Sequence, residues 1–233
     1  MASIISHTAT TFPAVVPVPT IPPLENGDRL DQPTFHERYE AMPEGTRAEL
    51  IGGIVYMASP LRFEHGHLDS LLSHWMGEYE LGTPGTKTVG GATVILGPEC
   101  EPQPDLSLLI SRQRGGQSTI DEDDYIVGAP ELVVEIASST ESYDLHLKKR
   151  EYESRGVREY VVAAARQQRV FWFALREGKY VELSPGTDGV FRSEIFPGLW
   201  LDPVSLFAND RAKLLSVLRD GLNSPEHAAW PLK

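Results

Sequence analysis

The spacing of apolar residues along the chain predicts a mixture of helices and strands. Between residues 64 and 79, apolar side chains recur at steps of three and four, which is the period of a helix with one buried face. A second long helix is predicted over residues 142–155, because Gly156 follows it and glycine commonly ends helices. Shorter helices are predicted at residues 34–42 and within residues 202–222. Apolar runs between glycine, proline and acidic turns predict strands at residues 48–51, 54–58, 88–96, 106–110, 132–137, 159–164, 169–175, 180–184 and 190–195.

The order of these elements defines the expected fold class. Gly52 and Gly53 separate the first two strands, and a two-residue glycine connection favours a tight hairpin. The helix over residues 142–155 lies between two predicted strands and supplies a crossover connection. Since hairpins and a crossover occur together, we expect an α/β (α+β) fold with a central mixed β-sheet flanked by helices.

The polar and proline-rich stretches predict where the folded domain begins and ends. Five prolines before residue 24 predict a disordered segment over residues 1–32. One folded domain is expected over residues 33–222, with residues 223–233 as a C-terminal tail. Within the domain, the polar span 112–130 is expected to be a mobile loop.

Composition narrows the class of protein. Of the 233 residues, 41% are hydrophobic and 23% are charged, which is ordinary for a soluble globular domain. The single cysteine, Cys100, excludes an internal disulfide and fits a reducing compartment. No run approaches the roughly 18 apolar residues that span a bilayer. We therefore expect a cytoplasmic protein with no membrane partner.

Charge argues against one mode of nucleic-acid binding. A formal net charge of −12 disfavours broad, unspecific coating of nucleic acid, because such binding depends on cations that displace counterions. The concentration of basic residues after residue 147 weakens this objection, because it places positive charge in one part of the chain. This group comprises Lys148, Lys149, Arg150, Arg155, Arg158, Arg166, Arg169 and Arg176.

Two carboxylates in predicted strands are candidates for chemistry. Glu135 lies in an apolar strand, where an ionised carboxylate is costly unless it is paired or binds a metal. The alternative is a glutamate that reaches solvent or pairs with an arginine. Asp105 follows Pro104 at a strand start, and a Pro-Asp pair alone is commonly a turn. We expect the two carboxylates to lie on neighbouring strands, where together they would offer hard oxygen ligands to Mg²⁺ or Mn²⁺.

Further candidates lie on the helices and the hairpin. Lys148 shares a predicted helix face with Asp144 and Tyr152, and could approach a water or a phosphate oxygen, although exposed lysines are common on helices. Glu49 could supply a third carboxylate or orient a water. His65 is interpreted as a residue at a helix start, because no zinc-site spacing surrounds it.

Several motifs occur in an order that resembles a known family. They are Glu49-Leu50-Ile51-Gly52-Gly53, Ser59-Pro60 followed by His65, Pro104-Asp105, Val134-Glu135-Ile136-Ala137-Ser138, Asp144 with Lys148 and Tyr152, Gly156-Val157 with Glu159-Tyr160, and Pro197-Gly198-Leu199-Trp200. This set, from about residue 33 to 208, resembles the Uma-two family of restriction endonucleases, a branch of the PD-(D/E)xK nuclease superfamily.

The resemblance implies a fold and a set of site residues. The fold would be restriction-endonuclease-like, with Asp105 and Glu135 as ligands of Mg²⁺ (or Mn²⁺). Because Ala137 stands where the superfamily has its strand lysine, Lys148 would replace that lysine from the following helix, and Glu49 would be an additional acidic residue. The chain departs from the family where a tryptophan and an aspartate are usual, since it has Val161 and Ala164 there.

Three functional hypotheses follow. The first is a divalent-metal-dependent endonuclease that hydrolyses nucleic-acid phosphodiester bonds, with DNA as the expected substrate and a homodimer expected by analogy with enzymes that cut both strands. Its catalytic residues would be Glu49, Asp105, Glu135 and Lys148. The second is a catalytically inactive nuclease-fold module for binding or assembly, which the acidic net charge favours. The third is a hydrolase of another phosphate ester.

Overall fold

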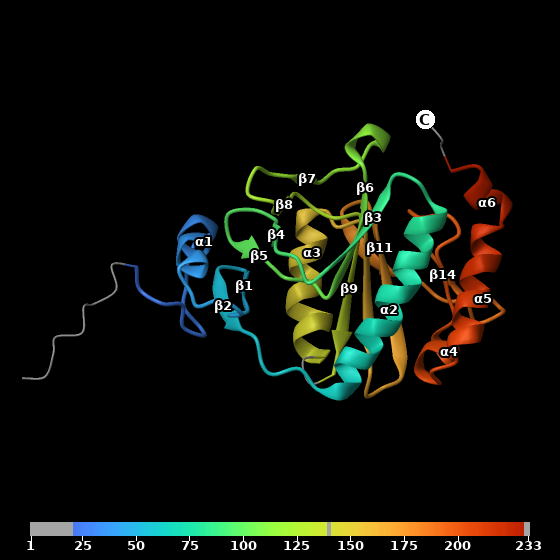
Figure 1. Cartoon of the computed structure of the whole chain (residues 1–233), viewed down its shortest axis with the longest axis horizontal. Coiled ribbons are helices and arrows are strands. Elements are labelled where there is room, and N and C mark those ends of the chain that lie inside the picture. Colours follow the sequence, from blue (N-terminus) through green and yellow to red (C-terminus); the bar gives the residue numbers. More distant parts are fainter. Residues whose placement is uncertain (1–20, 139–140, 231–233) are drawn as a thin grey trace, which may run out of the picture.

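A six-stranded sheet forms the centre of the molecule (Figure 1). The computed structural model describes residues 21–138 and 141–230. The strand order is β12-β11-β10-β9-β6-β3, in which β9 and β10 are parallel and all other neighbours are antiparallel. These strands are β3 (Thr86–Gly90), β6 (Leu106–Ile110), β9 (Leu132–Ala137), β10 (Glu159–Ala164), β11 (Arg169–Arg176) and β12 (Lys179–Glu182).

Helices cover both faces of this sheet, as the α/β (α+β) prediction required (Figure 1). One face carries α2 (Phe63–Gly82) and α5 (Arg211–Leu222). The other carries α3 (Lys149–Arg155), which continues from a π-helical segment, η2 (Tyr143–Lys148). The remaining helices are α1 (Gln32–Glu40), the 3₁₀ turn η1 (Arg112–Arg114), α4 (Pro203–Phe207) and α6 (Pro225–Ala228). No helix of the described residues is both long enough and apolar enough to cross a membrane.

The central strand β9 shows why the sheet forms here. All six of its residues are buried, since the sheet is covered on both faces. Val134 and Ile136 pack in the core beneath α2, whereas Val133 and Ala137 pack on the side of α3. The predicted bounds of β6, β9 and β10 are confirmed, because continuous apolar runs are typical of strands buried on both faces.

A smaller lobe packs beside the sheet, at the left of Figure 1. Its strands are β1 (Ala48–Ile51), β2 (Ile54–Met57) and β5 (Cys100–Glu101), in the order β2-β1-β5. The predicted glycine turn is confirmed, with positive φ angles of 58° at Gly52 and 74° at Gly53. Both residues adopt a backbone conformation that glycine enters without steric cost.

The start of the folded domain differs from the prediction. Residues 1–20 of the expected disordered segment lie outside the described residues. Within residues 21–32, however, Leu24 is buried and Leu30 N donates a 3.0 Å hydrogen bond to Gly53 O. The backbone of this segment forms hydrogen bonds with the otherwise unpaired edge of β2, and these bonds hold the segment in a defined conformation.

Four further regions differ from the prediction. The strand expected over residues 88–96 is divided at Gly91 into β3 and β4 (Val94–Ile95), and the expected mobile loop 112–130 contains β7 (Thr119–Ile120) and β8 (Ile126–Val127). These pair in the order β4-β8-β7, so the polar excursion is a small sheet. The expected strand 190–195 is shortened to β13 (Phe191–Arg192), which pairs with β14 (Trp200–Leu201). The predicted tail contains α6, capped by the Ser224 side chain.

Candidate active site

A cleft of about 250 Å³ lies between the small lobe and the central sheet. Its walls come from β1, β2, the segment that joins β2 to α2, and η2, and its floor from the start of β6 and from β9. All four residues predicted as catalytic, Glu49, Asp105, Glu135 and Lys148, line this cleft. Elements distant in sequence therefore bring these side chains to one place.

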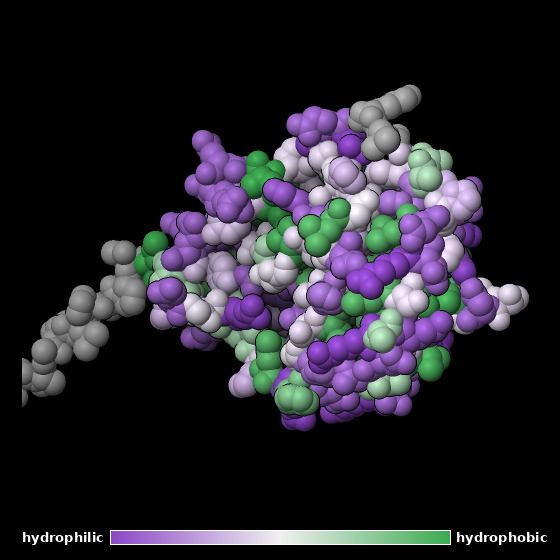
Figure 2. All heavy atoms as spheres, turned by 45° about the vertical axis from the view of Figure 1, so that its right-hand side comes forward, coloured by the Kyte–Doolittle hydropathy of each residue, from purple (hydrophilic) through white to green (hydrophobic). Residues whose placement is uncertain are grey.

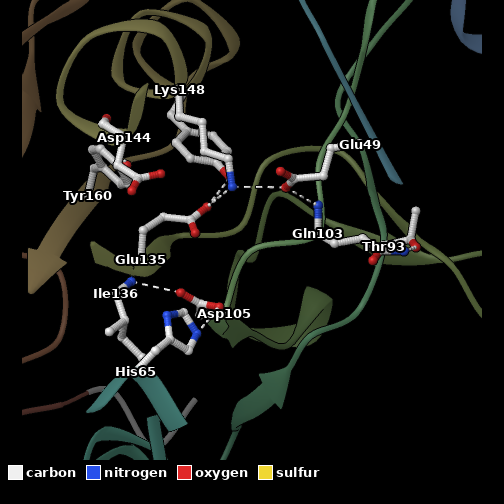
Figure 3. Close-up of polar contacts among 11 residues, drawn as sticks. Glu49, His65, Thr93, Gln103, Asp105, Glu135, Ile136, Asp144, Lys148 and Tyr160 are labelled. Atoms are coloured by element: carbon white, nitrogen blue, oxygen red, sulfur yellow. Dashed lines mark hydrogen bonds and ion pairs between the residues drawn. The ribbon is translucent and has the colours of Figure 1, made fainter. Parts of the chain in front are cut away.

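Lys148 joins two of the predicted carboxylates (Figure 3). Its Nζ lies 2.9 Å from Glu135 Oε1 and 2.9 Å from Glu49 Oε1. Glu135 Oε1 also accepts a 2.8 Å hydrogen bond from the Tyr152 hydroxyl. Glu135 and Lys148 are each only 4% exposed. The alternatives of a glutamate that reaches solvent and of an ordinary exposed helix lysine are therefore wrong.

Asp105 lies beside Glu135 because β6 and β9 are antiparallel neighbours. Their register aligns Leu106 with Val134, which brings the preceding Asp105 level with Glu135. Asp105 Oδ2 accepts a 2.7 Å hydrogen bond from Ile136 N, so the backbone of β9 orients the carboxylate (Figure 3). The expectation that the two carboxylates lie on neighbouring strands is confirmed.

His65 is a site residue whose contact the sequence interpretation missed. It does lie in the first turn of α2, as expected, but its Nε2 is 3.2 Å from Asp105 Oδ1. The hydrogen bond to Asp105 raises the pKa of His65, although burial acts in the opposite direction. One signal was present: His65 continues the buried face of Leu68 and Leu72, so it is a polar residue on an apolar stripe.

The π-helical segment η2 turns two polar residues toward the cleft. Asp144 and Lys148 are both buried, as is Tyr152 one turn further along α3, which confirms their shared face. The Tyr160 hydroxyl of β10 donates a 3.0 Å hydrogen bond to Asp144 O and ties η2 to the sheet. Local π-helical geometry is frequent where a helix serves a functional site.

Negative charge dominates the interior of the cleft. Burial raises the pKa of Glu135 well above its ordinary value; Lys148 opposes this shift, whereas Asp105, Asp144 and Glu49 add to it. Burial lowers the pKa of Lys148, but Glu135, Glu49, Asp144 and Tyr143 together raise it well above its ordinary value, so the ammonium stays charged. Glu135 therefore shares the interior of the cleft with Lys148 and three further carboxylates, while Arg47 and Arg62 line the same cleft.

The residues present fit a magnesium-type ion with few protein ligands. Among the described residues, no group of three or more His, Cys, Asp and Glu side chains is arranged to hold a metal. Mg²⁺ is, however, commonly bound by one or two carboxylates, with water and substrate phosphates completing the shell. Asp105 and Glu135 provide such a pair of hard oxygen donors at the floor of the cleft.

The cations around the cleft are not the ones that the sequence suggested. Of the eight basic residues concentrated after residue 147, only Lys148 lines the cleft. Others form exposed ion pairs, such as Arg169 with Glu182. The cleft is lined instead by Arg47 and Arg62, which lie much earlier in the sequence.

The fold and the cleft define an α/β protein with acidic residues and a lysine gathered at one end of a mixed sheet, and comparison with known proteins relates it to nucleases. The sequence profile of the Uma2 family, described as "Putative restriction endonuclease", matches residues 34–204, so the chain belongs to this family. A solved structure of a DUF820 protein from Anabaena variabilis, titled a putative nuclease, has the same fold. It is 16% identical, with a TM-score of 0.56, over 74% of this chain and 96% of that one. The curated proteins give no match.

Proposed function

We propose that the protein is a Mg²⁺- or Mn²⁺-dependent endonuclease that hydrolyses phosphodiester bonds of nucleic acid, with DNA as the first substrate to test. The contact of Lys148 with Glu135 and Glu49, beside Asp105 in one cleft, carries the proposal. Membership of the Uma2 family and the nuclease-type fold support it.

Each side chain has a role that its contacts suggest. Asp105 and Glu135 would hold the ion, which when bound supplies positive charge to a phosphate and acidifies water. Lys148 would donate hydrogen bonds to a phosphate oxygen as charge develops there. Two carboxylates at 2.9 Å keep this lysine protonated, so it acts as a donor rather than a base. Glu49 would hold the Lys148 ammonium in place, and its Oε1 also accepts a hydrogen bond from the backbone N–H of Gln103.

Calorimetry followed by a cleavage assay tests the proposal. Wild type, Asp105→Ala and Glu135→Ala are titrated with Mg²⁺ and Mn²⁺, and each is then incubated with plasmid and with single-stranded DNA. We expect both variants to lose ion binding and cleavage while circular dichroism shows that they remain folded. Glu122→Ala, an exposed glutamate away from the cleft, is the matched control and should behave as wild type. Cleavage by the two variants at the wild-type rate would refute the assignment.

A catalytically inactive binding or assembly module is the second candidate. The net charge of −12 and the lysine already paired with Glu135 favour it. This alternative predicts nucleic-acid binding or oligomer formation without turnover, unaffected by Asp105→Asn. The proposed nuclease predicts that Asp105→Asn abolishes turnover on every substrate that wild type cleaves.

A further inference from the structure

Two large apolar side chains are exposed where the chain passes from the wall of the cleft into α2. In the segment between β2 and α2, Leu61 is 62% exposed, and Phe63, the first residue of α2, is 88% exposed. Leu61 and Arg62 line the cleft that holds Asp105 and Glu135, and Phe63 is the next residue in the chain but not itself a lining residue. Exposed apolar side chains beside a functional cleft suggest contact with a bound partner.

The ring of Phe63 is held as a flat platform. It stacks on the imidazole of His67, one helical turn further along α2, with ring centroids 5.8 Å apart and planes 3° from parallel. Since the side chain is almost fully exposed, its other ring face is open to solvent. A supported aromatic ring with one open face can accept another planar group by stacking.

Positive charge directly precedes this platform in the chain, at Arg62. Arg62 and Arg47 both line the cleft. An aromatic face combined with cations that follow a phosphate backbone is the usual arrangement for binding single-stranded nucleic acid. A paired base inside a duplex has both faces stacked already, so away from a duplex end only an unpaired base can stack on Phe63.

The size of the exposed apolar surface argues against a contact between two copies of the chain. Hydrophobic residues form small separate patches on the face of the described residues that Figure 2 presents. Leu61 and Phe63 alone are far short of the roughly 1,000 Å² that a stable interface between two copies buries.

We propose that Phe63, supported by His67 and flanked by Leu61 and Arg62, stacks an unpaired base of the substrate and leads its strand to Asp105 and Glu135. The substrate class is therefore single-stranded or locally unpaired nucleic acid. This inference rests on the proposed nuclease function for the role of the cleft, but the stacking itself can be measured without cleavage.

Binding in EDTA tests the platform by itself. Wild type, Phe63→Ala and Phe63→Trp are titrated with an oligonucleotide that contains 2-aminopurine, as a single strand and as a fully paired duplex. We expect wild type to bind the single strand more tightly and to quench its fluorescence. Phe63→Ala should weaken single-strand binding by about 5- to 150-fold, the range for losing one base–aromatic stack, and Phe63→Trp should restore it. Leu81→Ala, on the same helix and 85% exposed at its other end, is the control.

The outcomes separate this inference from the proposed function. Equal single-strand binding and quenching by wild type and Phe63→Ala would overturn the platform, as would an equal loss of affinity for single strand and duplex. A wild-type dimer that Phe63→Ala dissociates would also overturn it in favour of a contact between copies. Stacking that depends on Phe63, without cleavage under any divalent ion, would support the stacking role of Phe63 and refute the nuclease function. Cleavage of single strands at the same rate by wild type and Phe63→Ala would support the nuclease function and refute the stacking role.

Discussion

Lys148 is the residue on which the charge balance of the cleft depends. It comes from a helix, yet its ammonium lies between carboxylates supplied by β9 and β1. Removing one partner of a buried ion pair leaves the other charge without compensation, which costs more than the pair itself contributes. The structural role of Lys148 can therefore be separated from its role in turnover.

We expect Lys148→Met to lower the free energy of unfolding by about 3–5 kcal/mol at pH 7, since Glu135 then loses its buried partner. Because protonation of Glu135 removes the uncompensated charge, the stability of the variant should recover as the pH falls. Urea unfolding over a pH series measures both effects.

The double variant Lys148→Met/Glu135→Gln should regain most of this stability and remain inactive in the cleavage assay. Arg150→Met, an exposed neighbour on α3, serves as the control and should change little. Equal stability of the single and double variants would show that the pair does not matter for folding.

At the scale of elements, buried carboxylates also connect strands to the segments beside them. Glu159 begins β10 and is fully buried, and it accepts 2.6 Å hydrogen bonds from Ser193 Oγ and from Glu194 N. Burial raises the pKa of Glu159 to about 7, although these hydrogen bonds act to lower it. The carboxyl thus titrates near neutral pH in the folded protein and near pH 4.5 when unfolded.

The folded state binds the proton of Glu159 more tightly, so its contribution to stability is complete below about pH 4.5 and is lost as the pH rises through 7. We expect this group to reduce the free energy of unfolding by about 3 kcal/mol over that window. Urea unfolding at four values between pH 5 and 8 compares wild type with Glu159→Gln, which keeps an acceptor but cannot titrate. A constant difference between the two proteins would contradict the prediction, because all other titrating groups are shared.

The hairpin turn that leads from β1 to β2 gives a second prediction at this scale. Gly52, with a φ of 58°, follows the strand that carries Glu49. We expect Gly52→Asn to be nearly neutral, because asparagine tolerates this conformation in two-residue hairpin turns. Gly52→Val should cost about 1–2 kcal/mol, since a β-branched residue is strained there. Thermal unfolding of both variants measures the difference, and a stable valine variant would contradict it.

At the scale of the whole molecule, net charge and local charge oppose each other. The chain carries −12 overall, while the cleft presents Arg47 and Arg62 at its walls. Few phosphates can be neutralised by so few cations, and each neutralised phosphate contributes to the dependence of binding on salt. Nucleic acid should therefore bind through a small local footprint.

We expect the logarithm of the association constant for single-stranded DNA to fall with the logarithm of salt concentration at a slope of about −1 to −2. Arg62→Ala should reduce the magnitude of this slope by about 0.7, the value for one phosphate contact. Fluorescence anisotropy in EDTA at several salt concentrations provides the measurement. A slope near −5 would indicate a broad basic surface instead.

The sequence by itself determined the elements and part of the site. The period of apolar residues follows from backbone geometry, so β6, β9, β10 and α2 were predictable from short segments. The same local reasoning indicated that Asp105 and Glu135 lie on neighbouring strands and that Lys148 shares a face with Asp144.

Tertiary structure alone decided which distant groups meet. The contacts of His65 with Asp105 and of Glu49 with Lys148, and the pairing of β4 with β8, join segments that no local pattern relates. The conformation of residues 24–30 likewise depends on hydrogen bonds to the free edge of β2. Hydrophobic periodicity records which face of an element is buried, whereas a partner is selected only when separate elements pack together and buried polar groups must all be satisfied.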